Sequence, residues 1–367
     1  MKTPWYVWCA LASVSCILIG GYWDISWHMT IGRDSFWTPA HIAIQLGGII
    51  AGSTGAYLIF ATTLGRAGLG DVSVRVWGFR GPLGAFIAVW GAAAMVISAP
   101  FDNWWHAAYG LDVKILSPPH AVLTLGILAV ATGGVLLIVA PLNRAARRTR
   151  LLETLLLVVA GEVLVLGMTS ILEHTFRSNL HRADAYRAIA IVGPLLVLAF
   201  GRVSSQRWAT TLIAGFYMAF MVAMLWLFPR FPAEAKLGPV YQPISHFIPL
   251  EFPMLVIAPA FAIDVVRPHV DAWPRWRRAL VYGSLFVLVL VIAEWPFAQF
   301  LMSEHARNWV FGTHYLPYMM HPQWYEARYE FMPDRDLVSG LVQAVIAGCL
   351  TSYLGLLLGD AMRKAKR

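Results

Sequence analysis

The chain has 367 residues, of which 58% are hydrophobic and only 13% are charged, and its mean hydropathy is +0.62. Soluble domains carry about 25% charged residues, so this composition excludes an ordinary soluble protein and indicates a chain that crosses a membrane many times. The net charge of +8 comes from basic loops between apolar runs, so it reports membrane topology and gives no indication of a nucleic-acid partner.

The apolar runs predict the membrane-spanning elements. A transmembrane helix needs about 20 mostly apolar residues, and on this rule we expect an all-α protein, a polytopic membrane helix bundle of about ten transmembrane helices. In chain order the predicted spans are roughly 4–22, 42–63, 82–99, 120–141, 152–172, 187–201, 208–228, 247–266, 279–302 and 338–361. The sixth is short, and Glu251 lies near the start of the eighth.

The loops predict the orientation. Most of the 28 Lys and Arg residues fall on the side that holds both chain ends, for example at 144–150 and 275–278. The positive-inside rule then makes both termini cytoplasmic in a multi-pass protein of the cytoplasmic (inner) membrane. Ten of the eleven His residues fall in outward loops or at the outward ends of spans, and His269 is the exception. We therefore expect the chemistry at the outer, periplasmic face.

Residues 24–41, which follow the first span, contain the first of two similar motifs. Asp24 and His28 are four residues apart, a spacing that places both side chains on one face of a helix. Pro39 forbids helix continuation and favours the first turn of a new helix, so the chain must turn before His41. That turn can bring His41 back over the other two side chains.

Residues 102–120 repeat the pattern after the third span, with one extra residue. Asp102 and His106 are again four residues apart, and His120 again follows a proline turn at 118–119. Two His and one carboxylate leave coordination positions open, which suits copper, non-haem iron or zinc with a bound water. We predict metal ligands, and catalytic residues if the protein is an enzyme, at Asp24, His28, His41, Asp102, His106 and His120.

The remaining sequence divides the chain in two. Residues 1–141 form a predicted four-helix membrane unit with both motifs at its outer face, and 142–367 a six-helix unit with long outward loops at 229–246 and 303–336. The second loop is rich in aromatic residues and is predicted to cap the outer pocket. Glu162 and Glu294 fall inside predicted spans, where a charge costs roughly 2.5–3.5 kcal/mol, so each is either functional or a hydrogen-bonded carboxyl.

The first motif resembles a known copper-binding signature. Its residues in order are Asp24, Trp27, His28, Arg33, Asp34, Thr38, Pro39 and His41. The pattern resembles that of the C subunit of particulate methane and ammonia monooxygenases, in which Asp, His and His with 3 and 12 intervening residues hold copper. The second motif is similar to that subunit's other site, spaced by 3 and 13 residues, where Asn stands in place of Asp102. The resemblance covers residues 1–141.

The resemblance implies a copper-dependent membrane oxygenase, or a subunit of one, that acts on a small hydrophobic substrate. Each motif would bind one copper ion. The implied partners are membrane lipid, an electron donor such as a quinol, further membrane or periplasmic subunits, and other copies of the same chain.

Three alternatives remain open from the residues alone. The protein could bind, store or transport copper without catalysis, because outward His and Met residues suit that role as well. It could be a haem protein with outward His pairs as axial ligands, although an Asp one helical turn away suits a small ion better. The repeat could also be structural, with Asp and His only hydrogen-bonded at an interface.

Overall fold

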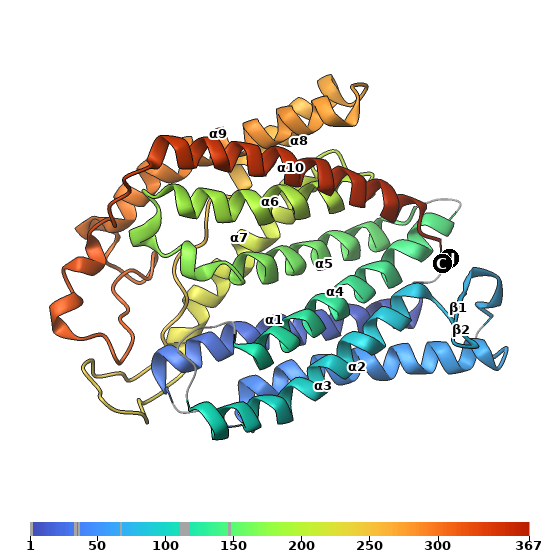
Figure 1. Cartoon of the computed structure of the whole chain (residues 1–367), viewed down its shortest axis with the longest axis horizontal. Helices are drawn as coiled ribbons and strands as arrows, with labels where there is room; N and C mark the ends of the chain where they lie inside the picture. The colour runs from blue at the N-terminus through green and yellow to red at the C-terminus, as the bar shows by residue number, and fades with distance from the viewer. Residues whose placement is uncertain are drawn as a thin grey trace. The chain divides into compact units, whose positions relative to one another are not determined.

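The protein is described here from a computed structural model that covers residues 3–32, 35, 37–66, 68–110, 117–145 and 148–366. Among these residues, nine helices are long and apolar enough to cross a membrane. The prediction of an all-α polytopic membrane bundle is confirmed, since the described strands form one two-stranded sheet (Figure 1).

Ten α-helices of the described residues follow the predicted order with shifted ends, and all but α8 are among the nine that could cross a membrane. They are α1 (Trp5–Thr30), α2 (Pro39–Thr63), α3 (Leu83–Tyr109), α4 (Pro118–Arg144), α5 (Arg150–Thr169), α6 (Ala183–Val203), α7 (Ala209–Leu227), α8 (Ile257–Val270), α9 (Arg275–Met302) and α10 (Leu337–Lys364). Short 3₁₀ turns are η1 (Gly70–Val72), η2 (Leu172–His174), η3 (Arg177–Asn179), η4 (Phe228–Arg230), η5 (Glu304–Ala306), η6 (Pro322–Trp324) and η7 (Ala327–Tyr329). Strands β1 (Val74–Val76) and β2 (Phe79–Gly81) pair antiparallel between α2 and α3.

The chain divides into two compact units. The first contains Met1–Asp24, Ser35–Val159 and Met362–Arg367, and the second contains Ile25–Asp34 and Ala160–Ala361. The division after residue 141 that the sequence suggests stays a prediction. The Asp24–His41 pair and the whole second motif lie in the first of these units.

Close packing of α3 against α4 positions the second motif. The two helices cross at glycines, which leave no room for a side chain. A Cβ added at Gly91 would lie 2.7 Å from the carbonyl oxygen of Gly126, and one at Gly84 would lie 2.6 Å from that of Gly133; both distances are too short for a real contact. Small residues allow membrane helices to approach closely, where van der Waals packing replaces the hydrophobic effect as the driving force. The two helices therefore form a tight hairpin that carries Asp102, the nearby His106 and His120 at one end.

The predicted eighth span, 247–266, is wrong in its first half. Residues 247–255 form no helix, and α8 begins at Ile257 and has only 14 residues. Pro249 and Pro253 explain the difference, because each lacks a backbone N–H and clashes with a helical turn before it. Most of this stretch is nevertheless buried in the second unit.

Side chains accept hydrogen bonds from backbone N–H groups of this buried segment. The Tyr217 hydroxyl accepts the backbone N–H of Met254 at 3.0 Å, and Glu294 Oε2 accepts that of Leu255 at 2.7 Å. Non-helical backbone at membrane depth is tolerated where protein groups take the place of water. Glu294, which is fully buried, is thus a hydrogen-bonded carboxyl that holds the segment before α8.

Candidate metal centre

The second motif converges at the end of the α3–α4 hairpin. Asp102 and His106 lie one turn apart near the end of α3, and His120 is the third residue of α4. Asp102 Oδ1 lies 3.5 Å from Nε2 of His106 and 3.5 Å from Nε2 of His120. One ligand atom from each of the three residues lies within 4.8 Å of the other two, so the three can hold one metal ion.

Local sequence explains why the two helices stop and start where they do. Gly110 ends α3 with φ of +85° and ψ of −163°, a conformation that is essentially restricted to glycine. Its N–H bonds the carbonyl of His106. Ser117 precedes α4 in an extended conformation, and prolines occupy the first positions of that helix. The intervening residues 111–116 lie outside the described part of the chain.

The His106 ring is oriented by a backbone carbonyl. Its Nδ1 lies 2.9 Å from the carbonyl oxygen of Gly110. A carbonyl can only accept, so Nδ1 carries the proton and, in the neutral ring, Nε2 presents its lone pair toward Asp102. A second hydrogen bond of this kind fixes the tautomer and orientation of metal-binding histidines.

Asp102 Oδ1 is the most informative atom of the site. It is shielded from solvent and has no hydrogen-bond partner among the residues that the structure describes. It faces two imidazole nitrogens, and an acceptor oxygen and a nitrogen lone pair repel each other unless a cation or a proton lies between them. Two ligands bound about 2.1 Å from a tetrahedral ion lie about 3.4 Å apart, close to the observed spacing. The residues therefore fit a small cation.

The first motif, on α1 and α2, pairs its Asp with its second His. His41 is the third residue of α2, after Thr38 and Pro39, and its Nε2 lies 3.0 Å from Asp24 Oδ1. Its Nδ1 lies 2.9 Å from the carbonyl oxygen of Ser35. The Ser35 carbonyl thus accepts a hydrogen bond from Nδ1 of His41 and turns Nε2 toward the carboxylate, as the Gly110 carbonyl does for His106.

His28 lies one turn beyond Asp24 on α1, on the portion that belongs to the second unit. Within the first unit the structure therefore brings together Asp24 and His41. Arg33 and Asp34, which contribute to the resemblance, lie outside the described residues.

No family model, curated protein or solved structure matches this chain. What the structure shows is a membrane-spanning helical protein with an Asp/His triad that could hold a metal ion. The likeness to the monooxygenase subunit rests on the residues of the two motifs.

Two other histidines that the sequence predicts to face outward, His174 and His181, contact other side chains of the protein. The His181 ring is stacked between Trp295 and Phe331, with centroid distances of 4.0 and 3.6 Å, and its Nε2 lies 3.1 Å from the Trp295 carbonyl oxygen. His174 lies on a different turn and pairs with Asp184 at 3.5 Å. The structure thus places these two histidines in different local contacts.

Sequence reasoning missed the carbonyl groups that orient the rings, because any residue can supply a carbonyl. One signal was present at the second motif, where Gly110 follows the first His by four residues and supplies the carbonyl; at the first motif Gly32 has the same spacing, but Ser35 supplies the carbonyl. Both glycines have positive φ, +85° at Gly110 and +78° at Gly32. The repeated glycine marks the point where each helix ends beside its motif.

Proposed function

We propose that the protein binds copper at both motifs and acts as a copper-dependent oxygenase, or as a subunit of one, on a small hydrophobic substrate. The observation that carries the proposal is the buried Asp102 Oδ1, which faces two histidine nitrogens at 3.5 Å. Bound copper would supply one-electron redox chemistry and a position for dioxygen.

The protein residues supply geometry and charge. Asp102, His106 and His120 hold the ion, and the Gly110 carbonyl keeps the His106 ring in the metal-binding tautomer. Three protein ligands leave coordination positions open, which reactive sites need and closed structural sites lack.

Two arguments support copper over other metals. Sites of nitrogen and oxygen ligands bind copper(II) more tightly than the other common divalent first-row metals, following the Irving–Williams order. The order and spacing of the two motifs also resemble the copper sites of the monooxygenase C subunit. The same resemblance supports a quinol as electron donor and partner subunits, and the positive-inside rule supports placement of the sites at the periplasmic side of the inner membrane.

A second candidate function is copper storage or transfer without catalysis. The side chains of Asp102, His106 and His120 are 29%, 32% and 38% exposed, so a bound ion would be within reach of an exchange partner. An oxygenase would instead need this opening to be covered, by a substrate or another subunit. Metal exchange and turnover assays separate the two functions.

The first experiment is the metal content of the detergent-purified protein. We expect one copper per motif in the unaltered chain, and the loss of one in His41→Ala and of one in His120→Ala. His305→Ala, an exposed histidine on another loop, is the matched control and should retain both.

The outcomes separate the parts of the proposal. Iron or zinc in place of copper would retain the metal sites and refute the copper chemistry. A well-folded protein that binds no added metal would refute both. Turnover of light alkanes, ammonia or longer hydrocarbons with a quinol donor tests catalysis, and copper-replete protein without turnover, but with exchangeable metal, would favour storage or transfer.

A further inference from the structure

Arg177 lies near two further arginines, Arg307 and Arg328, and near Glu251, in the second unit and away from either metal motif in sequence. Arg177, on η3, is 3% exposed. Glu251 Oε2 accepts the backbone N–H of Arg177 at 2.7 Å, and Glu251 Oε1 accepts from Arg328 Nη2 at 3.2 Å. Both carboxylate oxygens of Glu251 are thus already engaged.

The third arginine is held beside the others by an aromatic ring. The Cζ atom of Arg307 lies 3.7 Å from the centroid of the Tyr329 ring, and that of Arg177 lies 5.0 Å from the same centroid. The Tyr329 hydroxyl donates to the Thr313 carbonyl at 3.0 Å, which fixes the ring. Arg177 thus has two arginines and one carboxylate among its charged neighbours, so this cluster carries an excess of positive charge.

Several donors of this cluster are unused. Nε and Nη2 of Arg177, and Nε of Arg328, are shielded from solvent and have no hydrogen-bond partner within the described residues. Burial is the main reason that the pKa of Arg177 is lowered, and the charges of Arg328 and Arg307 lower it further. Guanidinium groups bind oxyanions through paired N–H donors, so an added oxyanion would satisfy both the charge and the hydrogen bonds.

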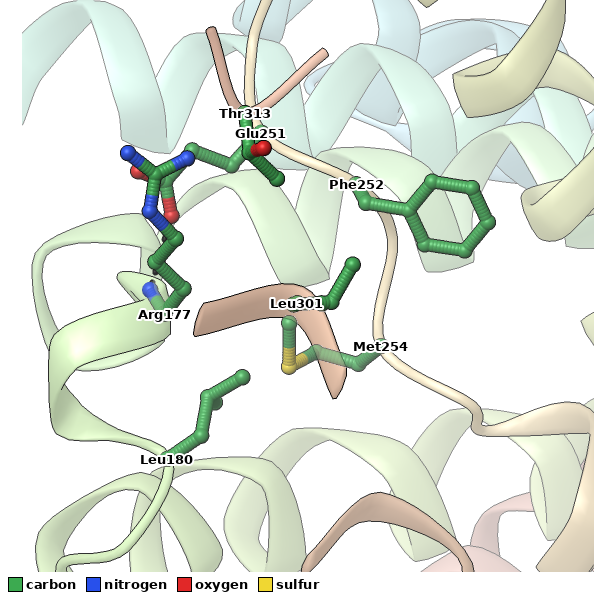
Figure 2. Close-up of a pocket in the computed structure, with 7 residues that line it drawn as sticks. All are labelled: Arg177, Leu180, Glu251, Phe252, Met254, Leu301 and Thr313. Carbon is green, nitrogen blue, oxygen red and sulfur yellow. Dashed lines mark hydrogen bonds between the residues drawn. The ribbon is translucent and has the colours of Figure 1, made fainter. Parts of the chain in front are cut away.

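The pocket next to Arg177 has a polar side and an apolar side. Figure 2 shows Arg177 and Glu251 together, with Leu180, Met254 and Leu301 at the other side and Phe252 lining the same pocket. An inorganic anion would use only the polar side. A molecule that joins an oxyanion to a hydrocarbon chain would use both.

We propose that this pocket binds a lipid through its phosphate headgroup. Arg177, Arg307 and Arg328 bind the phosphate, and the start of an acyl chain lies against Leu180 and Met254. The excess positive charge selects a lipid with net negative charge over a zwitterionic one. The pocket has no room for a water molecule in the free chain, so lipid binding would require the buried side chains of Leu180, Met254 and Leu301 to move apart.

The position of the cluster in the chain agrees with a lipid as the source of the phosphate. Arg177 lies between α5 and α6, and Arg307 and Arg328 lie between α9 and α10, so all three lie in loops that connect membrane-spanning helices. Lipid headgroups occupy this level at a bilayer surface.

The test is lipid binding to the full chain in detergent, measured by native mass spectrometry during titration. The probes are phosphatidylglycerol, phosphatidylcholine and inorganic phosphate. We expect saturable binding of phosphatidylglycerol, at least tenfold tighter than phosphatidylcholine, and at least tenfold weaker binding in Arg177→Gln. Arg335→Gln changes an exposed arginine of the same loop and should bind as the unaltered chain does.

Folding is controlled by a second variant. Arg307 is exposed, so Arg307→Gln should leave the melting temperature unchanged and still weaken phosphatidylglycerol binding several-fold. Equal binding of both phospholipids, binding of inorganic phosphate alone, or equal affinity in Arg307→Gln and Arg335→Gln would each overturn the proposal. The last result would show that the cluster only joins the loops of the second unit.

Discussion

Replacing Gly126 by alanine should weaken metal binding at the second motif without touching a ligand. A Cβ at this position would lie 2.9 Å from the carbonyl oxygen of Gly91 and 2.9 Å from the backbone nitrogen of Met95. These are backbone atoms of α3 and cannot rotate away. An ordinary contact requires about 3.4 Å, so α4 must move from α3 by about half an ångström, at a cost of about 1–3 kcal/mol.

The displacement reaches the site because Asp102 and His120 lie on opposite helices of this crossing. Their ligand atoms are 3.5 Å apart, and the shift would separate them to about 4.0 Å. Metal sites tolerate errors of about 0.2 Å in ligand distance. We expect roughly tenfold weaker copper binding, equivalent to about 1.4 kcal/mol.

The assay is competition with a chelator of known affinity, with circular dichroism to verify helix content. Gly134→Ala is the matched control on the same helix, because its Cβ would first meet the side chain of Val14 at an ordinary 3.5 Å. It should retain full affinity and gain stability from alanine's higher helix propensity, about 1 kcal/mol. Equal affinity in folded Gly126→Ala and Gly134→Ala would show that the crossing does not set the metal geometry.

Three further predictions concern single side chains or turns. Gly110→Ala forces alanine into a glycine conformation at a cost of about 1–3 kcal/mol and displaces the carbonyl that orients His106, so copper affinity should fall about 10–100-fold in the same competition assay. Asp102→Asn removes the charge of the carboxylate and should weaken binding of copper(II) more than binding of copper(I); an equal loss of affinity for both ions would contradict this. Asp334 accepts the backbone N–H of Ala183, which lowers its pKa, so its contribution to stability is present above about pH 4 and is lost as the pH falls through the folded-state value. Asp334→Asn should therefore flatten the acid side of a plot of melting temperature against pH, and an unchanged slope would refute this role.

Composition and periodic ligand spacing were enough to predict the helical bundle and the placement of both motifs at helix ends. The four-residue spacing places Asp102 and His106 on one face of a helix, and the prolines at 118–119 mark the start of α4. Only the structure shows that His120 and Asp102 meet, because a turn can return the chain at many angles. The prediction for residues 247–255 was wrong because a buried helix and a buried extended segment held by side chains can have equally apolar sequences.

That extended segment also has a consequence for how the chain enters a membrane. A helix satisfies its own backbone before it leaves water, whereas the amide of Leu255 depends on Glu294, which is synthesised 39 residues later. Inserted alone, the segment would carry bare amide groups into hydrocarbon at a cost of several kcal/mol each. We therefore expect it to enter together with α9, so that a chain truncated before α9 would keep the segment accessible to water-soluble labels and the complete chain would protect it.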